Sequence, residues 1–366
     1  RGNRNAVVTD FHRISHATGC QVSEHKVDFP ERTITWMYGS QSQFSQARLV
    51  LNCVAELRRA KDTAEFFEGL PALEQQLWVD DALRRLQVPS PEDNVPYICL
   101  LDSGINRGHA MLAPVLHQQD MHTVNDAWGV NDTANHGTGL AGVAIYGDMI
   151  DALSSTDAIE VGHRLESVKL TPNYGANVGD AKQHAYLFSS AVTRPEILNG
   201  QRKRIFSSAV TATAYRDFGR PSAWSSMVDS LAVDALAETP FPRLFVLSAG
   251  NIVDRDHWGN YPASLSVNQI HDPGQSWNAL TVGAFTDKVE LNEPEFIPVA
   301  DQGALSPFTT TSMGWEPVWP FKPDVVFEGG NAAANTEFVD NFASLELLTT
   351  SASSHRRSEE HTSELQ

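Results

Sequence analysis

Five short apolar runs decide what the larger part of this chain can fold into. The runs are YICLL, SVKL, IFSSAV, LFVLSA and ALTVGA, and they lie between Tyr97 and Ala284. Each is rich in residues that suit buried strands, and the stretch SAWSSMVDSLAVDAL between two of them has helical spacing. Such alternation requires right-handed crossovers. It predicts an α/β fold with a mostly parallel, doubly wound sheet and helices on both faces.

A smaller region of mixed, partly helical character precedes this pattern. We expect only short strands in residues 1–40, an amphipathic helix in residues 45–62, and two helices in residues 63–86 that break around Gly69 and Pro71. The stretch QVPSPEDNVP, residues 87–96, contains three prolines and is typical of a linker. The sequence therefore predicts an N-terminal accessory region over residues 1–95 and an α/β domain over 96–356.

Charge and cysteine content exclude several classes of protein. Lys and Arg number 27 and Asp and Glu 45, a formal net charge of −18, which argues against nucleic acid or an anionic membrane as the main partner. No apolar run approaches the length of a bilayer span. Cys20, Cys53 and Cys99 are widely spaced and indicate neither a disulfide framework nor a zinc site. We expect reduced thiols and a cytoplasmic location.

The last ten residues, RSEEHTSELQ, resemble the in-frame translation of a common sequencing-library adapter, and we expect residues 357–366 to be an artefact of this kind. Without them the net charge changes from −18 to −16, because one basic and three acidic residues are removed. The acidic character of the chain therefore does not depend on this tail.

Three polar residues follow predicted strands or open a predicted helix. Asp102 ends the run YICLLD, His136 stands before the compact apolar segment GTGLAGVA, and Asn251 closes the run LFVLSAGN. Sites in parallel sheets lie beyond the carboxyl ends of the strands. At such an edge Asp102 is a candidate for one half of a catalytic pair. Alone, Asp102 is also ordinary turn chemistry.

These stretches resemble the subtilase family of serine proteases in content and in order. D-S-G, H-G-T-x-x-A-G and S-A-G-N occur here in the family's sequence, and the resemblance covers roughly Tyr97 to Thr350. It implies a serine endopeptidase in which Asp102 orients His136, His136 is the general base and Asn251 belongs to the oxyanion hole. It implies no obligatory cofactor. Calcium often stabilises this family, although no ligand loop is identifiable.

The resemblance also implies where a substrate binds. Ser248, Ala249 and Gly250 would form a wall of the first specificity pocket, and Ser207 and Ser208 would lie along the edge where an extended peptide adds as a strand. The expected partner is thus a peptide or protein substrate.

Departures from the family pattern indicate a divergent bacterial branch. Asn135 replaces the usual Gly before His136, and Asn is among the few residues that tolerate a left-handed backbone. Gly139 stands where a second His is common. Lys322, Pro323 and Asp324 are kept, but the segment ends in FEGG.

The nucleophilic serine is the missing part. Ser312 in TTSMG precedes Lys322 and runs into WEPVWP rather than into a helix, so we interpret it as structural. Ser363 lies in the adapter-like tail. LELLTT, residues 345–350, fits the strand that normally comes shortly before the serine helix. We therefore expect a fragment that lacks its nucleophile and is inactive.

Other interpretations are weaker. A non-catalytic relative that binds peptides or partners is the main alternative, and a glycosidase pair built on Asp102 would leave the H-G-T and S-A-G-N stretches unexplained. His and Asp residues between positions 109 and 132 fit no compact metal-ligand spacing, and a polar loop is the simpler interpretation. GANVGD lacks the Lys-Ser/Thr of a phosphate loop, so a nucleotide site is not predicted.

Overall fold

The computed structural model describes residues 4–28, 33–46, 54–55, 63–70, 72–155, 157–173, 181–212, 217–236 and 242–352. The chain divides into two compact units, Arg1–Lys61 and Asp62–Gln366. The predicted helix over residues 45–62 and the GANVGD and adapter-like stretches lie largely or wholly outside the described residues.

The N-terminal unit is built on one helix and one hairpin. Helix α1 (Arg4–Ala17) is followed by the antiparallel pair β1 (Gln21–Asp28) and β2 (Thr33–Tyr38) and by α2 (Gln41–Gln46). Phe11 is buried at the centre of its small core, against Ile14, Val22 and Met37. The prediction of only short strands in residues 1–40 is therefore wrong for residues 4–17, which form α1.

The larger unit contains the predicted sheet, and the α/β fold class is confirmed. Its order is β12-β10-β9-β8-β4-β7-β5, with β13 also paired to β10. All of these strand pairs are parallel except β10 with β12. The strands are β4 (Tyr97–Asp102), β5 (Leu116–Thr123), β7 (Arg164–Lys169), β8 (Arg204–Ser208), β9 (Leu244–Ser248), β10 (Leu280–Thr286), β12 (Ala304–Leu305) and β13 (Val325–Glu328).

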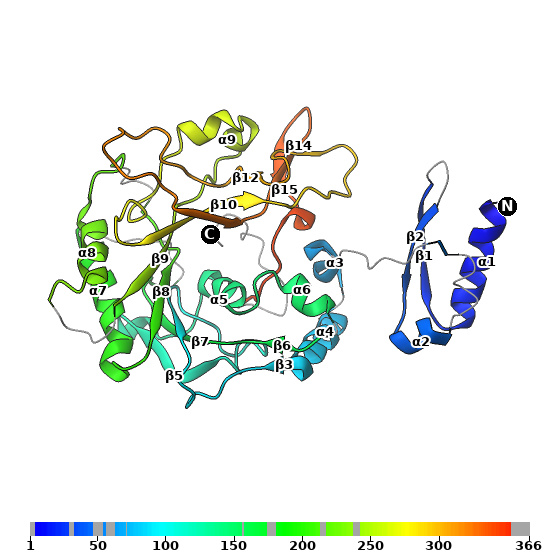
Figure 1. The fold of residues 1–366 in the computed structure, drawn as a ribbon, viewed down its shortest axis with the longest axis horizontal. Helices are drawn as coiled ribbons and strands as arrows, with labels where there is room; N and C mark the ends of the chain where they lie inside the picture. Colours follow the sequence, from blue (N-terminus) through cyan, green and yellow to red (C-terminus); the bar gives the residue numbers. More distant parts are fainter. Residues whose placement is uncertain are drawn as a thin grey trace. The chain divides into compact units, whose positions relative to one another are not determined.

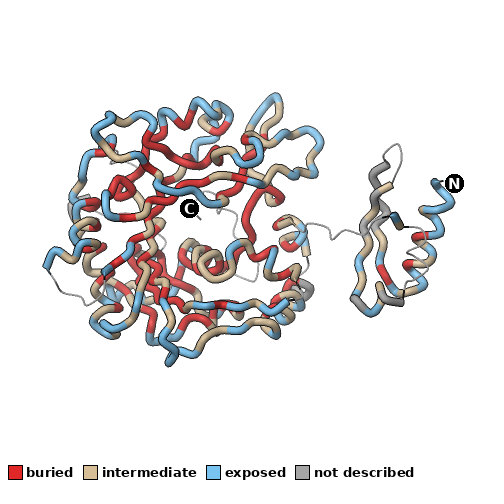
Figure 2. Tube along the Cα trace, in the orientation of Figure 1, coloured by how far each residue is buried: buried red, intermediate tan, exposed pale blue. Residues whose placement is uncertain are grey.

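Helices cover both faces of this sheet because alternate residues of a strand point to opposite sides. Cys99 and Leu101 of β4 pack with α7 (Ala181–Leu198) and α8 (Ala223–Ala232). Leu100 packs on the other side with α5 (His136–Tyr146). Figure 1 shows α5 opposite α7 and α8, and in Figure 2 buried residues run along the central strands.

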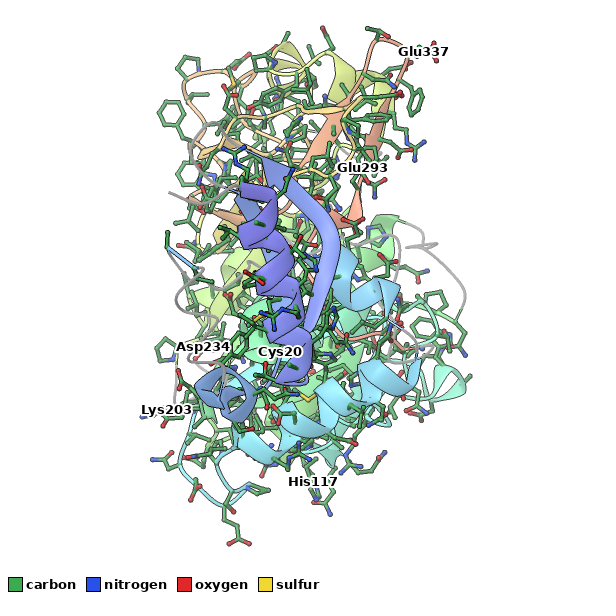
Figure 3. All side chains as sticks on the ribbon, turned by 90° about the vertical axis from the view of Figure 1, so that its right-hand side faces the viewer. Cys20, His117, Lys203, Asp234, Glu293 and Glu337 are labelled. Atoms are coloured by element: carbon green, nitrogen blue, oxygen red, sulfur yellow. The ribbon has the colours of Figure 1, made fainter. Side chains whose placement is uncertain are left out.

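Smaller elements complete the unit. Helices α3 (Ala64–Gly69) and α4 (Ala72–Arg85) are separated as Gly69 and Pro71 predicted, and they pack with α6 (Met149–Ser154) in the larger unit. Figure 3 shows exposed His117 and Lys203 toward one end of the unit and Glu337 toward the other. The remaining elements are β3 (Leu86–Gln87), β6 (Ile159–Glu160), α9 (Arg255–Gly259), β11 (Ile297–Pro298), β14 (Ala332–Ala334) and β15 (Val339–Asn341), with 3-10 turns Asp126–Trp128, Ala263–Ser266 and Ala343–Leu345.

Two further expectations differ from the structure. The stretch between Asp102 and His136 is not only a polar loop, because residues 116–123 form the edge strand β5. Residues 345–350 are not a strand; a 3-10 turn ends at Leu345 and the buried chain continues without a ladder. In the part of the chain that the structure describes, no helix is long and apolar enough to span a bilayer.

Candidate active site

Asp102 and His136 meet at the carboxyl end of β4. Asp102 is the last residue of the strand and His136 the first of α5. His136 Nδ1 lies 2.6 Å from Asp102 Oδ1, which also accepts a hydrogen bond from the Ser103 amide at 2.6 Å. The carboxylate side chain is only 2% exposed and the imidazole 19%. An orientation of this kind leaves the far ring nitrogen, Nε2, as the basic end of the imidazole.

A tight turn brings the imidazole to the carboxylate. Asn135, the residue before His136, has φ 69° and ψ −8°, the left-handed conformation that the sequence predicted Asn would tolerate here. Gly137 follows, and a Cβ on it would lie 2.1 Å from the Gly104 carbonyl oxygen. Only glycine fits at this position. Helix α5 can therefore start directly against the loop that carries Asp102.

Asn251 follows the end of β9, two strands from β4 in the sheet order. Its backbone forms an isolated antiparallel bridge with Thr309. Its side-chain oxygen Oδ1 is buried and has no hydrogen-bond partner among the described residues. Because β4, β8 and β9 are parallel neighbours, Asp102, Ser208 and Ser248 end at the same edge of the sheet. The segment that carries Asn251 leaves the sheet at that edge.

The predicted substrate-binding residues occupy two adjacent strand ends. Ser207 is half-buried in β8, and buried Ser208 donates its hydroxyl to the Leu101 carbonyl at 3.1 Å, which ties β8 to β4. Ser248 accepts from the Gly250 amide at 3.1 Å. The Ala249 carbonyl accepts from the Thr310 hydroxyl at 2.7 Å.

Gly250 is packed against an imidazole. Its φ is +109°, and a Cβ there would lie 2.4 Å from the His271 ring. The His271 amide donates to the Ala249 carbonyl at 2.9 Å, and His271 Nδ1 lies 3.3 Å from the Thr211 hydroxyl. His271, which the sequence analysis did not single out, thus lies behind the residues 248–250 and joins them to the loop that follows β8.

Asp272, next in the chain, is a buried carboxyl group that the sequence analysis also missed. Burial raises its pKa to about 6, although hydrogen bonds from Ser222 and Gln275 oppose the shift. The Ser222 hydroxyl donates at 2.6 Å and the Gln275 amide at 2.9 Å. No single-sequence signal marks a lone Asp before a Pro as buried.

The two serines weighed as nucleophiles lie elsewhere. Ser312 is buried, its hydroxyl accepts from the Lys322 amide at 2.9 Å, and its own amide donates to the Lys322 carbonyl at 2.9 Å. These bonds tie Ser312 to the backbone of Lys322. The Lys322 Nζ in turn donates to Asp324 Oδ2 at 2.6 Å. Ser363 lies outside the described residues. Within the described residues, no group of three or more His, Cys, Asp or Glu could hold a metal ion.

The fold and this edge define a class: an α/β protein with a carboxylate–imidazole pair at the carboxyl end of a parallel sheet. The sequence profile of the subtilase family matches residues 93–364. The chain belongs to the subtilase family. The family assignment, which the sequence predicted, is confirmed, and a serine peptidase is established at the level of the family.

Solved structures of proteases are similar to this chain at low identity. An S41 psychrophilic protease is 20% identical to this chain, and the match covers 69% of this chain and 73% of the protease, with a TM-score of 0.40. The epidermin leader peptide processing serine protease of Staphylococcus aureus is 14% identical, with coverage of 98% and 82% and a TM-score of 0.42. The CspB protease of Clostridium perfringens is 13% identical, with coverage of 72% and 83% and a TM-score of 0.44. No curated protein matches the chain.

Proposed function

We propose that this edge of the sheet is the acid–base part of a serine endopeptidase site, with Asp102, His136 and Asn251 in catalytic roles. The observation that carries the proposal is the 2.6 Å contact between His136 Nδ1 and Asp102 Oδ1 at the end of β4. Asp102 fixes the tautomer of the imidazole and stabilises the imidazolium that forms when His136 takes a proton.

The remaining steps follow from the chemistry of acyl transfer. A serine hydroxyl beside Nε2 of His136 loses its proton to the imidazole as its oxygen attacks the peptide carbonyl. The Asn251 amide donates to the oxygen that becomes negative, and His136 returns the proton to the leaving amine. Side chains alone perform these steps, and the mechanism needs no cofactor.

The substrate is a peptide or protein segment in an extended conformation. It passes the carboxyl end of β8, where Ser207 and Ser208 lie, and Ser248, Ala249 and Gly250 form one wall of the pocket for the side chain before the cleaved bond. The carboxyl ends of β4, β8 and β9 share one edge of the sheet with Asp102, which supports this arrangement.

The nucleophile is the remaining question, and we propose that this polypeptide hydrolyses no peptide bond. The bonds that engage the Ser312 hydroxyl with the Lys322 backbone support this. Purified protein of this sequence is expected to remain unlabelled by a fluorophosphonate probe. Covalent labelling, located by mass spectrometry on any serine, would contradict the proposal.

The gene on both sides of this sequence decides between an enzyme and a binding protein. A serine in a Gly-Thr-Ser or Ala-Thr-Ser stretch after Thr350 selects the endopeptidase. In that serine-bearing form D102N is expected to reduce kcat about 10⁴-fold, whereas D126N, at an exposed carboxylate, leaves it unchanged. A continuation without such a serine selects the alternative, a non-catalytic protein that binds peptides or partners.

A further inference from the structure

Asp132 is a buried carboxylate in the loop before α5, four positions ahead of His136, and only 8% of its surface is exposed. Its Oδ1 accepts from the Ser103 hydroxyl and from the amides of Ala134 and Asn135, each at 2.9 Å. Its Oδ2 accepts from the Thr138 amide at 2.8 Å and the Thr138 hydroxyl at 2.6 Å. Five donors on about four lone-pair sites use the whole acceptor capacity of this carboxylate.

The five donors belong to the segments that carry the catalytic pair. Ser103 directly follows Asp102, and its hydroxyl also accepts from the Gly137 amide at 2.9 Å. Asn135 and Thr138 enclose His136 from both sides in the chain. The carboxylate thus fixes the backbone before and after the imidazole and links it to the residue next to Asp102.

A buried cation compensates this charge. Lys169 ends β7 in register with Asp102, is completely buried, and donates from Nζ to the Asn131 carbonyl at 2.5 Å. Burial lowers the pKa of Lys169, and the negative charge of Asp132 opposes this shift. A buried carboxylate is stable only when it is paired or fully hydrogen-bonded, and Asp132 meets the second condition while Lys169 provides a nearby opposite charge.

We infer that Asp132 is a positioning residue that holds the imidazole of His136 in line with Asp102. This rests on the proposed function of that pair. An ordinary surface carboxylate could not do this, because three segments must be bonded at once. Asn in its place keeps the size but substitutes an NH₂ donor for one acceptor oxygen, so that two or three of the five donors face another donor.

The test compares D132N with D126N, which makes the same chemical change at an exposed carboxylate of the same loop. Protein labelled with ¹⁵N-histidine is observed by NMR, and the imidazole N–H proton bonded to Asp102 is assigned by its loss in H136Q. We expect a strongly downfield proton in the wild type and in D126N. We expect D132N to lose this signal and, in uniformly ¹⁵N-labelled protein, to increase amide hydrogen exchange at Asn135 and Thr138 by about tenfold or more.

Two variants at Thr138 keep the test decisive if D132N does not fold. T138S retains both donors to Asp132 and should keep the downfield proton, whereas T138V removes the hydroxyl donor and should shift it and accelerate its exchange with solvent. Thermal unfolding checks that both variants fold. An unchanged proton in folded D132N, or in folded T138V, overturns the inference. A wild-type protein without the downfield proton instead contradicts the Asp102–His136 pair, and with it the proposed function.

Discussion

Gly137 shows how closely the site is packed at the scale of a residue. A Cβ on Gly137 would meet the Gly104 carbonyl oxygen at 2.1 Å and Asp102 Oδ1 at 3.2 Å. Backbone atoms cannot move aside as a flexible side chain can. We expect G137A to lower the free energy of unfolding by at least about 1–3 kcal/mol, measured by chemical denaturation.

The matched control is G69A. Gly69 ends α3 with no atom within 4 Å of the Cβ position, so alanine there should leave stability unchanged or raise it slightly. Equal stability of G137A and wild type would mean that α5 does not start against the Asp102 loop.

Asp272 gives the protein a pH dependence with a definite sign. Its pKa in the folded state is about 6, above the ordinary value of an aspartate, so the folded protein binds the proton more tightly. This contribution to stability is present below about pH 4 and is lost as pH rises through about 6. The stability of D272N relative to wild type should therefore increase by about 2 kcal/mol between pH 4 and pH 7.

Denaturation curves at both pH values measure that difference. D126N, at an exposed position of the same unit, should show no such change. If the difference in the free energy of unfolding between D272N and wild type stayed constant across this range, the raised pKa of Asp272 would be contradicted.

Asn251 governs turnover and not folding in the proposed mechanism. In the serine-bearing form of the protein, N251A should reduce kcat by about 10²–10³ with little change in KM, because the amide acts on the developing oxyanion. N260A, at an exposed asparagine that directly follows α9, is the control. Equal losses of kcat in both variants would remove Asn251 from the oxyanion hole.

At the scale of an element, α7 depends on one buried face. Phe188 is fully buried and its ring lies 6.1 Å from that of Trp224 and 5.7 Å from that of Phe245, which joins α7 to α8 and β9. F188A should lower the free energy of unfolding by about 3–5 kcal/mol. Y186A removes a ring from the same helix that is 72% exposed, and should have almost no effect in the same denaturation measurement.

The strands that could be predicted are those whose apolar runs are buried on both faces. β4, β7, β8, β9 and β10 were predicted for this reason, whereas α8 was predicted from the helical spacing of its apolar residues. β5 could not be predicted, because it is an edge strand and its residues His117, Gln118 and Gln119 are exposed. Its sequence therefore lacks the apolar run that marks a central strand.

At the scale of the whole molecule, the two compact units have separate cores. Phe11 packs only with residues of the N-terminal unit among the described clusters, while Phe188 belongs to the core of the sheet. F11A should increase hydrogen exchange in α1, β1 and β2 and leave exchange in β4 and β8 unchanged, as measured by mass spectrometry. F188A is the reciprocal control. Increased exchange in β4 caused by F11A would show that the units share one cooperative core.

Site residues could be predicted where each lies in a recognisable motif, and not where the role depends only on contacts made in the folded chain. Asp102 and His136 were predicted as partners from D-S-G and H-G-T, and the structure places them in contact. Asp132 carried no such signal, because its role depends on bonds to Ser103 and Thr138 that only the folded loop provides. Spacing alone cannot distinguish it from a solvated loop carboxylate.

Helix α5 is held at its amino end by residues from far along the chain. The hydroxyls of Thr349 and Thr350 donate to the carbonyls of Gly139 and Thr138, each at 2.6 Å, and the Ala352 amide donates to the Asn135 side chain. Gly142 has no room for a Cβ because Thr349 and Thr350 lie against it.

On the ribosome, the helix that carries His136 is thus synthesised more than 200 residues before Thr349 and Thr350, whose hydroxyls bond to it. At about 5–20 residues per second, this delay lasts roughly ten to forty seconds. During that interval the amino end of α5 lacks the bonds that Thr349 and Thr350 supply. The packing around His136 is therefore completed only after Thr350 has been synthesised.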